Sequence, residues 1–336
     1  MSSTSLTPAD TPQRSPEASI WDAVDADSPT QLEAALNILR SLEPSYMPDI
    51  QRELSCAALQ KGSVPLTEYL LSHGYTRVED IRPTMIRNKV SIPLLEVLLA
   101  YGWDINTTGA KTSHEKGMSI VDEMIDDENI VVWLVEHGAR VDGGEVDAIV
   151  DPKPPALLEM CAARGSLKTF RFLRERGAKL GKRTLHVAAL RAANIGADPA
   201  RDNDGEESDG RGNGDGGNIG DTEKRNIEAL LRYLVDELKL DVNQAALDIP
   251  WFYGTPINHA AARPRGAAVV RWLLQKGADP HKFVNPEDHV EGSISQRFDA
   301  EAFSRMFKCD EVLAVLLNWR ENSTIKRDLK FAEQPV

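Results

Sequence analysis

The stretch that decides the fold is GTPINHAAARPRGAAVVRWLLQKGADP, residues 254–280. Thr255 followed by Pro256 predicts a helix start, because a threonine hydroxyl can accept from the first free N–H groups and proline suits the first helical position. The apolar run at 269–274 predicts a second helix, and Gly277 suits the left-handed residue that follows a helix. The segment therefore predicts a helix, a short turn, a second helix and a loop.

Neither of these helices is long enough to bury its apolar side alone, so the unit needs neighbours. The small side chains of Ala260 and Ala261 predict a place where another helix approaches closely. A unit of this kind is stable only when copies of it stack, which directs attention to repeats elsewhere in the chain.

The ending of the second helix recurs along the chain. Its copies are YLLSHGY (69–75), VLLAYGW (97–103), WLVEHGA (133–139), FLRERGA (172–178) and WLLQKGA (272–278), with LLRYLVDELKLDVN (230–243) as a copy that lacks its glycine. First-helix copies of varying fidelity are LSCAALQKG (54–62), LLEMCAARG (157–165) and TLHVAA (184–189), and IWDAVDADSPTQLEAALNIL (20–39) predicts one more helix pair. The recurrence indicates a repeat protein.

The pattern resembles the ankyrin repeat, whose period is about 33 residues and whose signature is T-P-L-H-x-A. TPINHAA keeps the threonine and proline, with Asn258 at the histidine position, and TLHVAA keeps His186, with Thr184 at the proline position. The resemblance covers roughly residues 18–283 and implies an all-α repeat solenoid of about seven stacked helix pairs, joined by loops or short β-hairpins. It also implies a concave face that binds other proteins.

Three segments depart from the repeat. Residues 1–17, rich in Ser, Thr and Pro, are predicted to be a disordered leader; its Ser/Thr-Pro pairs are either phosphorylation sites or part of a plain soluble extension. Residues 197–221, acidic and rich in glycine, are predicted to loop out between the two helices of one repeat, where length costs little. Residues 284–336 are predicted to be a C-terminal cap and tail, with a docking motif for a larger assembly as the alternative.

The amino-acid composition limits the classes of partner that the chain can bind and the cellular compartment in which it is expected. The chain carries 52 acidic and 39 basic residues, a net charge of −13, which argues against nucleic acid and anionic membranes as partners. Cys56, Cys161 and Cys309 lie in apolar helical contexts and are predicted to be reduced core residues of an intracellular protein, in cytoplasm or nucleus. The first residues contain no signal peptide, and the apolar runs are too short to span a bilayer.

No motif for catalysis, a cofactor or a metal is found. The chain lacks G-x-S-x-G, a P-loop, H-E-x-x-H and the Rossmann fingerprint, and DNDG at 202–205 has the wrong flanking spacing for an EF-hand. His73 and His137 precede capping glycines, where the helix dipole favours a cation. His186 matches the structural histidine of the family, and His259 is expected to be exposed. We therefore expect no enzyme, no cofactor and no metal.

Five aromatic residues are the candidates for partner binding. Tyr75 and Trp103 follow capping glycines, where the family usually has alanine, and Trp251, Phe252 and Tyr253 precede the helix start at Thr255. Aromatic side chains dominate interface hot spots. The alternative is that these rings fill gaps in the stack.

The sequence thus predicts a non-enzymatic, monomeric scaffold or adaptor that binds other proteins on its concave surface. Three alternatives stay open. The chain is the recognition part of a signalling or immune-like receptor, or the regulatory subunit of an enzyme whose active part is another chain. The third is an enzyme whose catalytic residues are dispersed and match no motif.

Overall fold

The computed structural model describes residues 15–109, 117–142, 156–200, 219–245, 254–282 and 298–332, with side chains described up to Asn322 but not for Ile219. The regular elements in these ranges are helices, and pairing of β type is limited there to isolated bridges such as Thr108 with Ser119. The expected all-α class is confirmed for this part of the chain. No helix in it is both long enough and apolar enough to cross a bilayer.

The chain divides into two compact units, which we describe separately. The first holds the residues up to Met124 together with Glu136–Ala139, and the second holds Ile125–Val135 and the residues from Arg140 onward.

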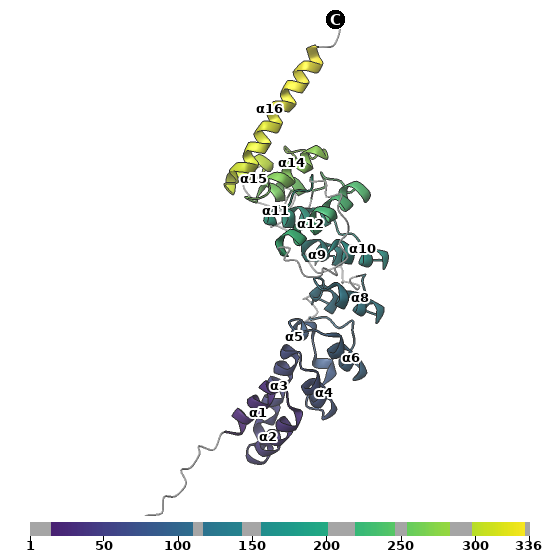
Figure 1. Ribbon diagram of the computed structural model, residues 1–336, viewed down its shortest axis with the longest axis vertical. Helices are drawn as coiled ribbons and strands as arrows, with labels where there is room; N and C mark the ends of the chain where they lie inside the picture. The colour runs from purple at the N-terminus through teal and green to yellow at the C-terminus, as the bar shows by residue number, and fades with distance from the viewer. Residues whose placement is uncertain are drawn as a thin grey trace, which may run out of the picture. The chain divides into compact units, whose positions relative to one another are not determined.

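Short helices make up the first unit (Figure 1). They are α1 (Pro16–Asp25), α2 (Pro29–Leu42), η1 (Pro44–Tyr46), α3 (Met47–Lys61), α4 (Val64–Ser72), η2 (Val78–Asp80), α5 (Pro83–Ile86), α6 (Ile92–Ala100) and α7 (Ile120–Glu123). Helices α1 and α2 pack on each other, α1 packs on α3, and α2 packs on α4.

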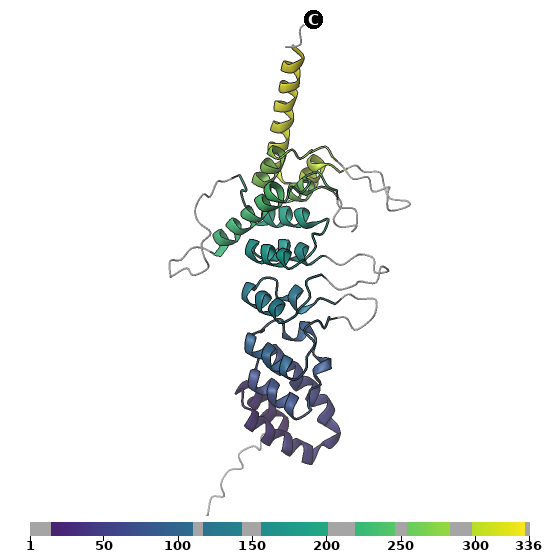
Figure 2. The ribbon, with the colours of Figure 1, turned by 90° about the vertical axis from the view of Figure 1, so that its right-hand side faces the viewer.

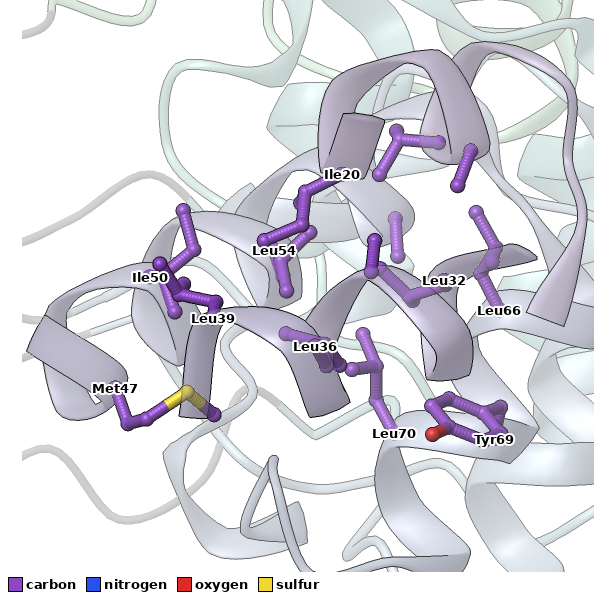
Figure 3. Packing of buried hydrophobic residues seen from close by; sticks show 14 residues of the cluster. Ile20, Leu32, Leu36, Leu39, Met47, Ile50, Leu54, Leu66, Tyr69 and Leu70 are labelled. Carbon is purple, nitrogen blue, oxygen red and sulfur yellow. The ribbon is translucent and has the colours of Figure 1, made fainter. Parts of the chain in front are cut away.

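The core of the first unit begins with α1 to α4. Ile20, Leu32, Leu36, Leu54 and Leu70 are buried and point toward one another from the four helices (Figure 3). In α2 the buried positions recur at intervals of three and four residues, which is the spacing of one helix face. Each fully buried leucine side chain stabilises the fold by about 1.5–3 kcal/mol.

The second unit contains the remaining helices, in teal to yellow in Figure 2. They are α8 (Glu128–Glu136), whose last residue counts with the first unit, α9 (Leu157–Arg164), α10 (Leu167–Glu175), α11 (Thr184–Ile195), α12 (Ile219–Arg232), the π-helix η3 (Tyr233–Glu237), α13 (Pro256–Ala261), α14 (Ala267–Gln275), α15 (Ala300–Met306) and α16 (Asp310–Ala332). Each of α9, α11, α13 and α15 packs on the next helix in the chain. In addition, α9 packs on α11, α11 packs on α13, and α13 packs on α15.

Serine starts many of these helices. The hydroxyls of Ser28, Ser63, Ser91 and Ser166 accept the N–H of the residue three places later. Such N-caps satisfy one of the free donors of the first turn. At α13 the predicted start is confirmed, with Thr255 as N-cap and Pro256 as the first residue. The predicted hydroxyl bond is wrong, because Thr255 Oγ1 is buried without a hydrogen-bond partner among the described residues.

The predicted helix endings are confirmed in their backbone geometry. Gly74, Gly102, Gly138, Gly177 and Gly277 all have a positive φ. In the copy that lacks glycine, the exposed Lys239 adopts the left-handed conformation instead, with φ of 56°. The structure thus keeps the same ending where the sequence lacks the residue that favours it.

Asparagine side chains brace successive helix endings, a feature that the sequence analysis missed. The amide of Asn106 donates to the carbonyl of Gly138 at 3.2 Å, and that of Asn243 donates to the carbonyl of Gly277 at 3.0 Å. Each asparagine ends a short motif, DIN at 104–106 and DVN at 241–243. The recurrence of this motif could have predicted the shared role of the two asparagines.

The structure corrects two predicted boundaries. Helix α1 begins at Pro16 and Ser15 caps it, so residues 15–17 do not belong to the disordered leader predicted for 1–17. The insertion is also shorter than 197–221. Ala197 is buried, the N–H of Asp198 donates to Glu228 at 2.8 Å, and residues 219–221 belong to α12. Residues 1–14 and 201–218 lie outside the described residues.

Candidate partner-binding surface

Trp103 is not a surface residue. Its side chain is 4% exposed, and its indole N–H donates to the carbonyl of Ile81 at 3.1 Å. A buried indole needs such an acceptor, and here the backbone supplies one. The prediction that Trp103 contributes to a binding surface is therefore wrong, and its ring fills space inside the first unit.

Trp251, Phe252 and Tyr253 lie outside the described residues. Their exposure and their role in binding stay predictions.

Tyr75 belongs to an aromatic cluster at the end of α4, which we call the α4 cluster and define as Arg40, Tyr69, His73 and Tyr75. The half-buried Tyr75 ring stacks on the His73 ring, with centroids 6.0 Å apart and planes 17° apart. The Tyr69 ring lies 4.2 Å from His73 and 6.0 Å from Tyr75. The three rings thus form one continuous group.

Arg40 connects the α4 cluster to α2. Its guanidinium carbon lies 5.8 Å from the centre of the Tyr75 ring, and its Nη2 donates to the Tyr75 hydroxyl. The same side chain donates to Asn37 at 3.1 Å. A cation held over an aromatic face is attracted by the ring quadrupole, so the guanidinium and the ring hold each other in place.

The local backbone explains why Tyr75 lies where it does. Gly74 takes a left-handed conformation with φ of 69°, and the Tyr75 N–H then donates back to the carbonyl of Leu70 at 2.9 Å. This ending turns the chain at the end of α4 and brings Tyr75 beside His73. In α6, which ends in the same way as α4, Tyr101 has the place that His73 has in α4 and is 37% exposed.

The α4 cluster combines a guanidinium with two phenol rings and an imidazole. Burial, with smaller contributions from Tyr75 and Glu33, raises the pKa of Tyr69 to about 12, so this phenol stays neutral at physiological pH. Tyrosine and arginine are enriched among residues that contribute most to protein binding. Among the described residues, Tyr75 is the candidate from the sequence whose surroundings fit that role.

Two histidines of the second unit, His186 and His259, lie against each other inside it. His186 is fully buried, and its Nε2–H donates to the carbonyl of Gln244 at 2.8 Å. Burial lowers its pKa to about 4, which keeps the ring neutral. His259 is half-buried, with its ring 5.5 Å from His186 and nearly perpendicular, so the prediction that His259 is exposed is wrong.

A buried ion pair was missed by the sequence analysis. Glu159 lies in α9, and Arg183 directly precedes α11; both are less than 10% exposed. Arg183 Nη2 donates to Glu159 Oε2 at 2.8 Å, and the Arg183 N–H donates to Oε1 at 2.8 Å. This pair joins α9 to the start of α11 and is almost entirely shielded from solvent, so its role is structural.

The three cysteines are free thiols. Cys161 and Cys309 are buried, and burial raises the pKa of both, that of Cys161 to about 12. Over the described ranges, no three His, Cys, Asp or Glu side chains come together in a way that could hold a metal ion.

Comparison with known proteins adds no family to this picture. No protein-family model matches the chain, and no curated protein matches its sequence significantly.

Proposed function

We propose that the chain is a non-enzymatic protein-binding scaffold of ankyrin-repeat type. The observation that carries this proposal is the recurrence of one helix ending, with a positive φ at Gly74, Gly102, Gly138, Gly177 and Gly277. Helix pairs that end alike can stack alike, and stacked pairs offer an extended surface in place of an enclosed active site. In this proposal the stack is a solenoid whose concave face binds a protein partner.

Charge and residue chemistry support a protein as the ligand. With a net charge of −13, the chain repels nucleic acid and anionic lipid and attracts basic protein surfaces. The α4 cluster adds a guanidinium and three rings, a combination common in hot spots. Trp251, Phe252 and Tyr253 are a second proposed contact. We place the protein inside the cell, in cytoplasm or nucleus.

Two other arrangements use the same surface. In one, the chain is the recognition part of a signalling or immune-like receptor. In the other, it regulates an enzyme whose active part is another chain. A scaffold is expected to retain partners without any added ligand, whereas a receptor part or a regulatory subunit is expected to come with one dominant signalling protein or enzyme.

The test is affinity capture from the native source with the full chain as bait, followed by mass spectrometry. The variant Arg40→Ala, Tyr75→Ala should lose the main partner, with binding weakened by at least about 2 kcal/mol. Ile38→Ala is the matched control, because Ile38 lies on α2 near Arg40 and is 53% exposed but outside the cluster. Equal capture by the parent and the double variant, with both folded by circular dichroism, would place the binding surface elsewhere.

A further inference from the structure

The segment from Arg164 to Arg183 carries a charge opposite to that of the whole chain. It runs from the last residue of α9 through α10 and along the loop to α11. It holds eight basic residues and a single acidic one, Glu175, in a chain whose net charge is −13. A local field of this sign can attract an acidic ligand that the rest of the chain repels.

Half of these eight cations are neutralised inside the protein. They pair with carboxylates at 2.6–3.5 Å, and the pairs are Arg164 with Asp126, Lys168 with Glu128, Arg171 with Glu237, and Arg183 with Glu159. The other four are exposed and form no ion pair within the part of the chain that the structure describes. We call these four the α10 cations and define them as Arg174, Arg176, Lys179 and Lys182.

Two of the α10 cations are held in place by uncharged groups. Helix α10 packs on α12 (Figure 1), and Tyr233 is buried in η3, directly after α12. Arg174 Nη1 donates to the Tyr233 hydroxyl at 2.9 Å, and the guanidinium carbon of Arg176 lies 4.9 Å from the centre of the Phe172 ring. A hydroxyl and a ring face hold a guanidinium without cancelling its charge, so its other N–H donors stay available to an anion.

The other two α10 cations lie on a loop that is fixed at both ends. Gly177 turns the chain at the end of α10 with a φ of 96°, and the N–H of Arg183 donates to the buried Glu159 at 2.8 Å. Lys179 and Lys182 lie between these two points. Binding at this loop therefore costs little backbone ordering.

The helix dipole does not account for the α10 cations. It favours a cation at the end of a helix, and the corresponding endings of other copies also carry one. Those cations are paired, and the pairs are Arg77 with Glu79, Arg140 with Asp142, and Lys276 with Asp236. The ending of α10 differs because its four cations have no carboxylate among the described residues, so it retains a charge that a ligand can neutralise.

The surroundings of the α10 cations favour a short acidic peptide segment. The guanidinium fork matches the geometry of a carboxylate. Leu180 lies between Lys179 and Lys182 and is 39% exposed, so it offers an apolar contact beside the charges. A long polyanion such as nucleic acid would extend onto the acidic remainder of the chain, whereas the field of the α10 cations reaches only about 8 Å at physiological ionic strength.

We propose that the α10 cations bind a short segment of a partner protein that is rich in aspartate and glutamate and contains an apolar residue. The carboxylates of this segment pair with the four cations, and its apolar residue packs on Leu180. This surface lies in the second unit and the α4 cluster lies in the first, so the proposal does not depend on the contact proposed for Arg40 and Tyr75.

Fluorescence anisotropy of the full chain tests the proposal, with a fluorescein-labelled peptide of aspartate, glutamate and one leucine as the probe. The parent should bind this peptide and should not bind its counterpart with asparagine and glutamine in place of the acids. Arg176→Gln combined with Lys179→Gln removes two of the cations and should raise the dissociation constant about fivefold. Lys182→Gln alone should raise it about twofold.

The matched control is Arg265→Gln combined with Lys308→Gln. It removes one arginine and one lysine, both exposed and in the same unit, and should leave the affinity unchanged. Arg40→Ala combined with Tyr75→Ala should also bind the peptide as the parent does, which separates this surface from the α4 cluster. Circular dichroism verifies that each variant is folded.

Three results would overturn the proposal. The first is a parent that does not bind the acidic peptide. The second is equal weakening by the α10 variants and the matched control, which would show a response to net charge alone. The third is tighter binding of a labelled single-stranded oligonucleotide than of the peptide, which would assign the α10 cations to nucleic acid.

Discussion

Arg183 and Glu159 meet in the interior of the second unit through three hydrogen bonds. Arg183 Nε and Nη2 donate to Glu159 Oε2 at 3.2 and 2.8 Å, and the Arg183 backbone N–H donates to Oε1 at 2.8 Å. Gly181 lies against this pair, because a Cβ there would be 2.1 Å from Glu159 Oε1. The ion pair, and not an unusual φ, is what requires glycine at position 181.

Glu159→Leu should lower the free energy of unfolding by about 3–5 kcal/mol, because it leaves the Arg183 guanidinium buried and uncompensated. The double variant Glu159→Leu, Arg183→Met should lose less than this single variant, since it removes both charges. Urea unfolding of the parent, the two single variants and the double variant gives the coupling energy. Losses that simply add would show that the two charges do not depend on each other.

Lys239→Gly should raise the free energy of unfolding by about 1 kcal/mol, because it relieves a left-handed φ at an exposed non-glycine residue. Gly277→Ala is the matched opposite, with an expected loss of about 1 kcal/mol. Its φ is 90° and a Cβ would meet nothing within 4 Å, so the cost is that of the backbone alone. Thermal and urea unfolding measure the change in the free energy of unfolding for both variants. A neutral or destabilising Lys239→Gly would show that the lysine side chain contributes more than the strain removes.

His186 should make the fold sensitive to acid. Its pKa is lowered to about 4 in the folded state from 6.5, so the unfolded chain binds the proton more tightly. The contribution of the neutral ring is complete above pH 6.5 and is lost as the pH falls toward 4, a change of about 3 kcal/mol.

The variant to compare is His186→Asn, because Asn258 has the corresponding place in α13 and its amide donates to the carbonyl of Lys282 at 3.4 Å. The free energy of unfolding should fall less steeply for the variant than for the parent between pH 6.5 and 4. Parallel pH curves would mean that other groups account for the acid sensitivity.

Replacement of residues 201–218 by a short Gly-Ser linker should change the melting temperature by less than about 3 °C, because loop length costs little. Replacement of 197–221 should lower it by more than about 5 °C. The longer replacement also removes the buried Ala197, the hydrogen bond from Asp198 to Glu228 and the first turn of α12. Differential scanning calorimetry compares the two, and equal melting temperatures would mean that these anchors do not contribute.

Trp251→Ala combined with Tyr253→Ala should leave the chain folded and weaken the main partner by at least about 2 kcal/mol. The expectation rests on the alternation of side chains in an extended segment, which cannot turn three consecutive rings inward. Circular dichroism and titration of the captured partner measure the two effects. An unfolded variant would show that the rings belong to the core, and a folded one with parental affinity would exclude them from the interface.

The sequence by itself determined where several of the helices start and end, although it did not mark α5 and α7. Thr255 with Pro256 marked a helix start, and Gly74, Gly102 and Gly277 marked helix ends, because caps depend on the few residues around them. The burial of Ala260 and Ala261, both 0% exposed, also followed from local pattern, since small residues on an apolar face favour close packing.

Only the tertiary structure decided what the side chains beyond each cap contact. Tyr75 and Trp103 follow capping glycines in the same way, yet one joins a half-buried cluster with Arg40 and the other is enclosed and bonded to Ile81. From the sequence, Glu159 and Arg183 would be expected on the surface, because both are charged. They are buried because each neutralises the charge of the other. These side-chain contacts join residues that are far apart in the sequence, so the spacing of neighbouring residues cannot predict them.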